Sequence, residues 1–283
     1  MNLELEQILR SATNLPVIPA VATKVLELVD SLQVNNEELA KLIGVDPALS
    51  MRVLKLANSS FYGCPRKILT LPHAVMMLGY GTLRTVVISM SLRQIYSPFG
   101  LAEKNLWEHS VGVGLAAGTI AKFLHLNADE AFLCGIFHDL GKIVMNYLDP
   151  VRFSQVMQAY YNFELSYIEA EQQNYSYTHA ELGSEVIKKW NLPLSLSEVV
   201  AKHHTLHFDP DADDQLVELT CITNLGDLFC ECLGIGTRGC EVEVNLAEST
   251  SAKMLNLDAE QLELMLLEFK TQHEANADLF NKV

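Results

Sequence analysis

The sequence lacks the features that mark disulfide-stabilised, membrane-spanning and repetitive proteins. Its six cysteines are scattered over 283 residues without a CxxC pair, so neither a disulfide framework nor a structural zinc site is predicted. No uncharged apolar run approaches the roughly 18 residues of a membrane span, and the acidic start of the chain does not resemble a signal peptide. Low-complexity tracts and repeats of fixed period are also absent. We therefore expect a cytoplasmic protein without membrane contact.

The composition is that of a globular protein with an uneven distribution of charge. Hydrophobic residues make up 49% of the chain and charged residues 19%, which excludes a disordered chain. The net charge is -15, yet residues 1–97 hold nine Lys or Arg and seven Asp or Glu, against eleven and twenty-eight in residues 98–283. Either the basic-leaning part docks on the acidic part of the same chain, or it meets an external anionic partner.

Helical periodicity dominates the chain, and alternating β-branched runs are missing, so the sequence predicts an all-α protein. Helix starts are predicted where Asn35 precedes Glu38 and where Asp258 precedes Gln261, because a side chain and a backbone N–H at that spacing can bond reciprocally. The SPFG stretch at residues 97–100 is the predicted boundary between two helical lobes. The expected division is an N-terminal helical lobe at 1–97, a second helical lobe at 98–232 and a C-terminal helical appendage at 233–283.

Histidines and aspartates in the second half carry the chemical signal. They fall in the contexts WEHS, FHDLGK, THAELG, KHHT and ITNLGDLF, separated by 23 to 40 residues. Imidazole and carboxylate together suit Zn, Mn, Fe or Ni, and a site assembled from several helices needs ligands this far apart. Gly141 is expected to end the helix that carries the adjacent pair in FHDLGK. The candidate metal ligands are His109, His138, Asp139, His179, His203, His204 and Asp227.

A buried polar network that stabilises the helices is the alternative interpretation of the same residues, with Asp139 and Asp227 fixing the tautomers of the imidazoles. A lone histidine at an apolar position is more often such a core residue than a metal ligand. The clustering of several histidines and aspartates in one half of the chain favours the metal site.

Several long motifs resemble a known family. HDLGK is similar to the signature of the HD superfamily, whose members are helical metal-dependent phosphohydrolases. With LPVIP, DPALSMRVLKLANSSFYG and LPHAVMMLGYGTLRTVVISMSL before it and HAELGSEVIKKWNLP after it, the chain resembles the HDOD domain, the HD-related output domain of bacterial signalling proteins. The resemblance spans residues 15–232. It implies an all-α regulatory module whose second lobe is HD-like.

The seven candidate ligands also resemble those of the HD-GYP phosphodiesterases, which cleave cyclic di-GMP. After His204, however, those enzymes continue with an acidic residue and a Gly-Tyr-Pro motif, where this chain has TLHFDPDADDQ. The resemblance further implies that Lys142 lies near a phosphate. In a phosphohydrolase, Asp139 and Lys142 would be catalytic: a divalent ion (Fe, Mn, Ni, Zn or Mg) lowers the pKa of bound water toward about 7, and Lys142 offsets developing charge.

Two functions of different classes follow. The first is a signalling protein that acts through protein partners and whose HD-like pocket binds a divalent metal, a nucleotide or a phosphate. The second is a metal-dependent phosphohydrolase or phosphodiesterase. The complete ligand set favours the enzyme, and the missing Gly-Tyr-Pro continuation favours the signalling protein.

Three weaker patterns bear on partners. Residues 38–58 have the pattern of a helix-turn-helix with Arg52 and Lys55 on its second helix, but the strongly acidic chain makes nucleic acid an unexpected partner. The small residues at 110–118 are expected to allow close helix packing rather than to bind a nucleotide. The predicted helix at 258–269 has an apolar stripe that either docks on the body or forms a homodimer face. Its members are Leu262, Met265, Leu266 and Phe269.

Overall fold

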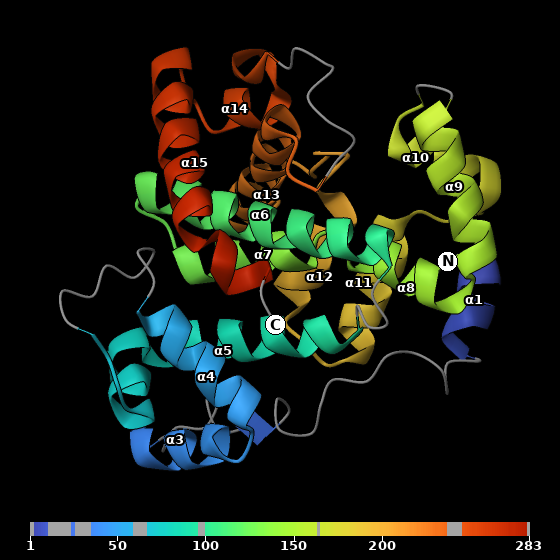
Figure 1. Ribbon diagram of the computed structural model, residues 1–283. Coiled ribbons are helices and arrows are strands. Elements are labelled where there is room, and N and C mark those ends of the chain that lie inside the picture. Colours follow the sequence, from blue (N-terminus) through green and yellow to red (C-terminus); the bar gives the residue numbers. More distant parts are fainter. Residues whose placement is uncertain are drawn as a thin grey trace.

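A computed structural model describes residues 3–10, 24–25, 35–58, 67–95, 100–162, 165–236 and 245–281 (Figure 1). Within these ranges every regular element is a helix, which confirms the predicted all-α fold. None of these helices combines the length and the apolar character that crossing a membrane requires.

In the described part of residues 35–95, three helices follow one another along the chain. They are α3 (Asn36–Gly44), α4 (Pro47–Ala57) and α5 (Leu71–Ile95). The side chain of Asn35 accepts a hydrogen bond from the backbone N of Glu37 and so caps α3, while Pro47 opens α4, where its missing N–H costs nothing. α5 is kinked at Gly79, whose φ of 73° lies in the left-handed region. The predicted helix-turn-helix pattern corresponds to α3 and α4.

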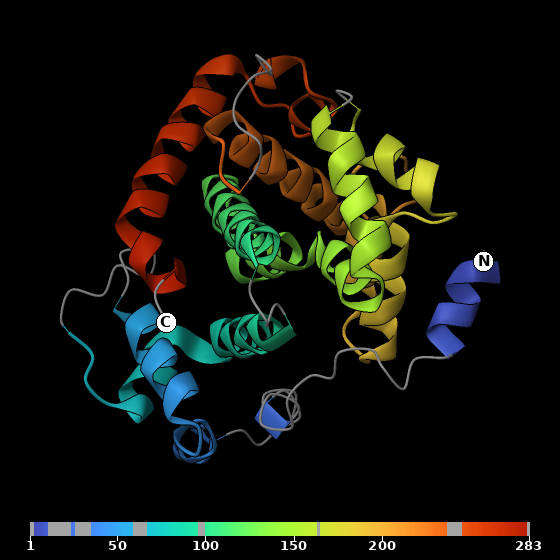
Figure 2. The same cartoon turned by 45° about the vertical axis from the view of Figure 1, so that its right-hand side comes forward.

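The second lobe is built around one long helix. α6 (Leu101–Phe123) packs along α7 (Ala128–Phe137) and α13 (Asp214–Leu233), and Figure 2 shows it at the centre of this lobe. A Cβ atom on Gly135 of α7 would come within 2.7 Å of the Cα atom of Gly114 on α6, so the two helices can only meet at this distance through small residues. The segment 110–118 therefore serves helix packing, as predicted.

Shorter helices cover one side of this centre. They are α8 (Leu140–Leu148), α9 (Pro150–Asn162), α10 (Tyr167–Asn174), α11 (His179–Lys189) and α12 (Leu194–Lys202). α8 crosses α11 closely, and α12 packs against both α11 and α13. The crossings bring the start of α11, the turn between α7 and α8 and the end of α12 together beside α6.

The C-terminal part consists of a 3₁₀ turn, η1 (Leu246–Glu248), and the helices α14 (Thr250–Met254) and α15 (Ala259–Asn281). The predicted start of the last helix is confirmed, since Asp258 and Gln261 exchange backbone-to-side-chain hydrogen bonds of 3.0 and 2.8 Å. Leu262, Met265 and Phe269 are buried, and α15 packs mainly on α6, so the apolar stripe docks on this chain. α15 also reaches α4 and thereby spans both lobes (Figure 2).

Two contacts cross the expected boundary between the lobes. α5 of the first lobe contacts α7 of the second, where the Thr82 hydroxyl donates a 2.8 Å hydrogen bond to Asp129. α1 (Leu3–Arg10), which the expected boundaries assign to the first lobe, lies against α11 of the second. The predicted boundary stretch lies outside the described ranges except for Gly100, so the division itself stays a prediction.

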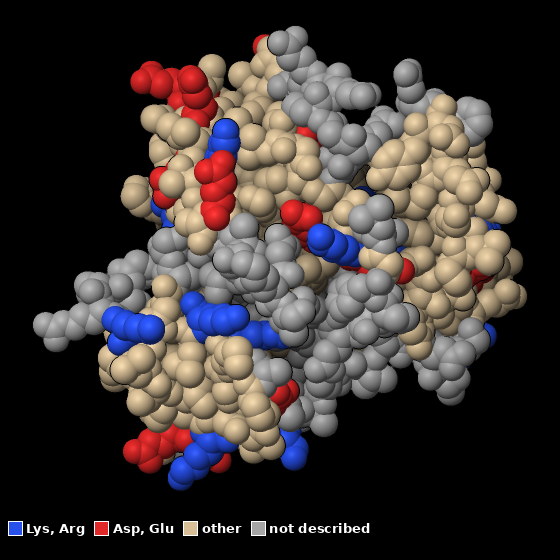
Figure 3. Space-filling view, in the orientation of Figure 1, with Lys and Arg blue, Asp and Glu red and all other residues tan. Residues whose placement is uncertain are grey.

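Basic side chains are unevenly placed on the surface. On the face shown in Figure 3, Lys and Arg side chains of the first lobe lie along its upper edge and, beside acidic side chains, at its lower end. Helix α4 of this lobe carries Arg52 and Lys55.

Candidate metal centre

The side chains of all seven candidate ligands meet inside the second lobe. Their ligand atoms form two groups, in each of which every atom lies within 4.8 Å of the others. The first group, called here the Asp139 group, contains Asp139, His179, His203 and His204. The second, called the Asp227 group, contains His109, His138 and Asp227. Residues that lie up to 118 positions apart in the sequence are thus neighbours in space.

The turn between α7 and α8 allows two adjacent residues to serve one site. α7 ends one residue before His138, and α8 begins one residue after Asp139. The helix therefore breaks directly before His138 and Asp139. The sequence predicts this break at Gly141, and that prediction is wrong. Gly141 lies inside α8 instead, where a Cβ atom would come within 1.9 Å of the carbonyl oxygen of His179. Its role is to let α8 and α11 approach each other at the site.

Four of the histidines bond outward through Nδ1, so that Nε2 faces the cluster. Nδ1 of His179 lies 2.9 Å from both carboxylate oxygens of Glu171. In the other three, Nδ1 lies near a backbone carbonyl oxygen: 3.0 Å from Ile235 in His109, 2.6 Å from Gly135 in His138 and 2.7 Å from Val200 in His203. A carbonyl oxygen only accepts, so Nδ1 of these three rings carries a proton, and Nε2 has a lone pair in the neutral ring and a second proton in the imidazolium. Metal-binding histidines are oriented in this way.

Asp139 lies between the two groups and is fully buried. Its Oδ1 is 3.2 Å from Nε2 of His179 in the Asp139 group. Its Oδ2 is 3.4 Å from Nε2 of His138 and 3.8 Å from Nε2 of His109 in the Asp227 group. One carboxylate oxygen therefore faces each group. Asp227 completes the second group, with Oδ1 3.0 Å from Nε2 of His109.

The inward nitrogens crowd one another. Nε2 of His179 lies 3.1 Å from Nε2 of His204 and 3.4 Å from Nε2 of His203. Two lone pairs at this distance repel, so the arrangement requires a proton or a cation between them. Nε2 of His138 and Oδ1 of Asp139 are buried without a hydrogen bond, although Nε2 of His179 lies 3.2 Å from Oδ1. Buried polar atoms are normally bonded, and these two fit a ligand among them.

Both aspartates are held in the ionised form. Burial raises the pKa of Asp139, but its interactions with His138 and Lys142 lower it by more, so the net pKa lies well below its usual value. Burial also raises the pKa of Asp227, and the hydrogen bond and charge of His109 again outweigh it, which leaves the pKa low. Ionised carboxylates are the form that binds a metal ion.

The histidines divide into two kinds. Burial lowers the pKa of His203 and His204, that of His204 to about 3, and the positive charge of neighbouring histidines adds to this. Burial also lowers the pKa of His109 and His179, but the nearby carboxylates outweigh it and the net pKa is raised. His203 and His204 are therefore neutral and have a lone pair for a cation. His109 and His179 favour the protonated form because carboxylates lie beside them.

Lys142 joins the cluster as its one lysine among the described residues. Its Nζ lies 2.7 Å from Oδ2 of Asp139 and 4.1 Å from the centre of the Tyr167 ring, and the side chain is 10% exposed. Burial lowers the pKa of Lys142, but Asp139 raises it by more, so the ammonium stays charged. Lys142 thus lies beside the candidate ligands, and its charge already neutralises that of Asp139.

Glu171 is a further member of the site that sequence reasoning missed. It belongs to α10, is fully buried, and accepts hydrogen bonds from both the backbone N and Nδ1 of His179. The α10 sequence YIEAEQQN gives no motif, and its eight-residue distance from His179 has no fixed meaning. The one available signal is an acidic residue on the buried face of a short helix.

The donor set fits a divalent transition metal. Imidazole and carboxylate ligands suit Zn, Mn, Fe and Ni, whereas Mg prefers oxygen ligands and keeps several waters. The Asp227 group offers three ligand atoms and the Asp139 group four, and His204 is partly exposed. Either group therefore has enough donors for one ion, and His204 marks the side on which the site is closest to solvent.

A curated relative matches most of this chain. A protein of Treponema pallidum (strain Nichols), described only as uncharacterized, is 25% identical over 222 residues. The match covers 76% of this chain and 43% of the relative. This chain therefore spans less than half the length of the curated protein that it matches.

Solved structures share the fold. An HDOD domain protein of unknown function from Geobacter sulfurreducens matches with a TM-score of 0.80 at 23% identity, over 97% of this chain and 95% of its own. A protein from Shewanella amazonensis SB2B, whose name assigns it provisionally to metal-dependent phosphohydrolases, matches with a TM-score of 0.69 at 20% identity over 98% of both chains. Identities this low establish the fold alone. The family model of the HDOD domain matches residues 15–206, and the chain belongs to this family.

Proposed function

We propose that this chain is a bacterial signalling protein of the HDOD family, which acts through protein partners and whose HD-like pocket binds a divalent metal. The observation that carries the metal site is the convergence of Nε2 atoms from histidines that are each oriented by a bond at Nδ1. A purely structural polar network would need a shared proton between the nitrogens that lie 3.1 and 3.4 Å apart, whereas a bound cation would satisfy all of them together.

The ligands divide between two metal positions that share one carboxylate. Asp139 serves both positions because each of its oxygens faces a different group. When bound, a divalent ion lowers the pKa of its water toward about 7 and polarises a phosphoryl oxygen. Glu171 orients His179 and does not itself bind the metal. The proposed ligands are His109, His138, Asp139, His179, His203, His204 and Asp227.

The state of Lys142 favours regulation over catalysis. Its ammonium is bonded to Asp139, stacked on Tyr167 and nearly buried, so it is poorly placed to meet a phosphate that enters from solvent. Moreover, the sequence after His204 lacks the Gly-Tyr-Pro motif with which HD-GYP enzymes recognise their substrate. A pocket with metal but without substrate contacts suits a sensor or a structural centre.

A metal-dependent phosphohydrolase is the second candidate function. Two groups of ligand atoms that share Asp139 offer the arrangement with which paired metals stabilise attacking and leaving oxygens. In this function Asp139 and Lys142 are the catalytic residues, and phosphates or nucleotides are the ligands. The observation in its favour is the completeness of the ligand set.

Metal analysis of the full chain, purified without chelators, tests the site. We expect about one or two transition-metal ions per chain, and a loss of metal in His138→Ala and Asp139→Ala. His73→Ala is the matched control, because His73 is exposed on α5 in the first lobe. If the two site variants keep their metal, the proposed centre is wrong.

Turnover separates the two candidate functions. We expect slow hydrolysis, at most, of cyclic di-GMP and bis(4-nitrophenyl) phosphate with added Mn²⁺, Fe²⁺ or Ni²⁺. Rapid hydrolysis that His138→Ala abolishes and His73→Ala preserves would establish the phosphohydrolase instead.

The remaining proposals concern partners and organisation. We take protein partners to be the main targets and nucleic acid not to be one, since the chain carries a net charge of -15. The apolar stripe of α15 is used within the chain, so a homodimer would need another face. We assign residues 1–97 and 98–232 to the two lobes and residues 233–283 to the appendage, in a cytoplasmic protein.

A further inference from the structure

The carboxylate of Glu4 on α1 is bound by several donors of the second lobe. Nη1 of Arg152 donates to one oxygen at 2.5 Å, and the hydroxyl and backbone N of Ser176 donate to the other at 2.5 and 3.3 Å. Arg152 is itself fixed, because its Nε donates to the carbonyl oxygen of Asn174 at 2.7 Å and its guanidinium lies 4.1 Å from the centre of the Tyr175 ring. A carboxylate bound on both oxygens is recognised specifically, unlike one in a simple surface ion pair.

The rest of α1 is held by apolar burial and by its C-terminal end. Leu5 and Leu9 are 4% and 7% exposed, although α1 has eight residues and lies at the edge of the molecule. The ammonium of Lys189 on α11 donates to the carbonyl oxygen of Leu9. A cation at the last carbonyls of a helix also interacts favourably with the helix dipole. The second lobe therefore contacts α1 in three ways: it binds the carboxylate of Glu4, buries Leu5 and Leu9, and donates to the carbonyl oxygen of Leu9.

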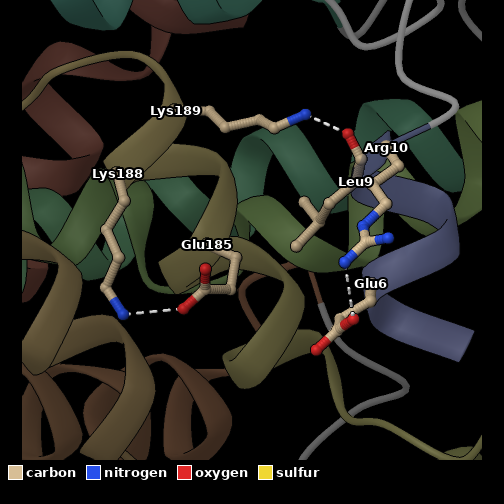
Figure 4. A pocket seen from close by; sticks show the side chains of 6 residues that line it. All are labelled: Glu6, Leu9, Arg10, Glu185, Lys188 and Lys189. Atoms are coloured by element: carbon tan, nitrogen blue, oxygen red, sulfur yellow. Dashed lines mark hydrogen bonds and ion pairs between the residues drawn. The ribbon is translucent and has the colours of Figure 1, made fainter. Parts of the chain in front are cut away.

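An open pocket lies beside α1 on the second lobe. A cavity of about 570 Å³ lies between α1 and α11, and Figure 4 shows the side chains that line it. Its charged residues are neutralised in pairs, Arg10 with Glu6 and Lys188 with Glu185. Leu9 is the apolar residue among them. Leu9 belongs to α1, and the second lobe contributes Glu185, Lys188 and Lys189, so a helix with further acidic turns would make more contacts here than α1 does.

α1 is poorly suited to hold this position on its own. A helix of eight residues is too short to be stable in water, so α1 stays helical only while it is docked. Its advantage is covalent attachment, which keeps its local concentration high. A competing helix that is longer or better fitted can overcome this advantage.

We propose that this surface is a docking site for an acidic amphipathic helix of a partner protein, and that α1 occupies it until such a helix takes its place. We call it the α1-binding surface and define it by Arg152, Ser176, Lys188, Lys189 and the cavity beside them. The matching helix has a Glu directly before a Leu, a second Leu four residues later, and a C-terminal turn within reach of Lys189. This inference rests on the proposed signalling function, because it takes the occupant of the surface to be a partner protein. The contacts that define the surface do not depend on that function.

The α1-binding surface adjoins the candidate metal centre. Ser176, which donates to Glu4, lies three residues before His179, and Thr178 between them caps the start of α11. On the inner side, the backbone N of His179 donates to Glu171. The segment 175–179 therefore contacts α1 through Ser176 and Glu171 of the site through His179. A change in the docking of α1 would act on His179 through this segment.

A labelled peptide tests the docking site on the full chain. The probe is a fluorescent, hydrocarbon-stapled helix with the sequence of residues 2–11, because stapling removes the cost of forming the helix. In Leu5→Asp/Leu9→Asp the tethered α1 can no longer compete, and Glu4→Arg is a second way to open the surface. We expect the peptide to bind either opened chain at least tenfold more tightly than the wild-type chain. Equal binding to opened and wild-type chains, or no binding to any, overturns the proposal.

Charge reversal checks that the peptide uses the same contacts as α1. Adding Arg152→Glu to Leu5→Asp/Leu9→Asp should weaken binding at least tenfold, and a peptide with Lys in place of Glu4 should regain it. If reversal of Arg152 has no effect, the peptide binds elsewhere and the assignment fails. No step requires a metal, so a failed docking site and a failed metal centre are separate results.

Discussion

The buried carboxylate of Glu171 holds His179 at two points, accepting a 3.0 Å hydrogen bond from its backbone N and lying 2.9 Å from its Nδ1. The first contact fixes the start of α11, and the second fixes the tautomer and the direction of the ring. Nε2 of His179 is consequently directed at Asp139 and His204. A residue outside the candidate ligand set thus sets the direction of the ring that the proposed metal site requires.

Glu171→Gln should weaken metal binding about 10- to 100-fold, the usual effect of losing a partner that orients a ligand. The amide keeps the volume of the side chain but can turn its NH₂ group toward Nδ1 and select the wrong tautomer. Competition with a chromophoric chelator measures the affinity. Glu169→Gln on the same helix is the control, because Glu169 is exposed and bonds only at the helix start. Unchanged affinity in Glu171→Gln would show that the pair is merely structural.

The ion pair of Lys142 and Asp139 makes a second prediction. Lys142→Met leaves a buried carboxylate without its cation and should destabilise the metal-free protein by about 3–5 kcal/mol. A metal ion at the cluster supplies positive charge beside Asp139, so added metal should restore much of this loss. Chemical denaturation with and without metal measures both effects. Lys188→Met, in an exposed pair with Glu185, should cost less than about 1 kcal/mol.

The outcome also decides the role of Lys142. If Lys142→Met leaves stability unchanged but abolishes a measurable phosphohydrolase activity, the lysine is catalytic and not a partner of Asp139. Loss of stability with rescue by metal supports the regulatory function.

Much of the site follows from sequence, and the parts that do not have a physical reason. His138 and Asp139 are recognisable by their motif, and the other ligands by residue type and by separations that a multi-helix site requires. By contrast, the carbonyl oxygens of Gly135, Val200 and Ile235 orient three histidines through backbone atoms, which every residue possesses. Such contacts depend on tertiary packing and leave no mark in the sequence.

The fold shows the same division between local and distant contacts. Asp258 with Gln261 predicts a helix start correctly, because both hydrogen bonds join residues three apart. For Gly141 the sequence predicts a helix end, since glycine is common there. Its actual role depends on α11, which lies about forty residues further along the chain, and only the packed structure reveals it.

Gly141→Ala should destabilise the protein by about 3 kcal/mol or more, because the added methyl group would overlap the carbonyl group of His179. The neighbouring atoms are backbone and cannot move aside as a flexible side chain could. Gly44→Ala at the end of α3 is the matched control, since its nearest neighbour is a side-chain carbon at 3.7 Å. It should stay within about 0.5 kcal/mol of wild type or gain slightly. Similar stability of both variants would mean that α8 and α11 do not approach this closely.

The docking of α1 should depend on pH through Glu4. Burial raises the pKa of Glu4, but its hydrogen bonds with Ser176 and Arg152 lower it by more, so the net pKa lies below the unperturbed 4.5. An acid whose pKa is lowered by folding stabilises the docked form above its unfolded pKa and loses this effect as the pH falls through the folded pKa. α1 should therefore stay docked at neutral pH and loosen once the pH falls below about 4.5.

Hydrogen exchange of the amides in α1, corrected for the intrinsic effect of pH and compared with the amides of α6, measures this release. Protection in α1 should be constant from pH 7 to 5 and fall in more acidic solution. Glu4→Gln should show weaker protection at pH 7 and no such fall, because an amide lacks the charge that Arg152 binds. Glu6→Gln should behave as wild type, since Glu6 pairs with Arg10 of the same helix. Protection in the wild-type chain that persists to pH 3 would mean that the carboxylate does not hold α1, and apolar burial of Leu5 and Leu9 would remain as the cause.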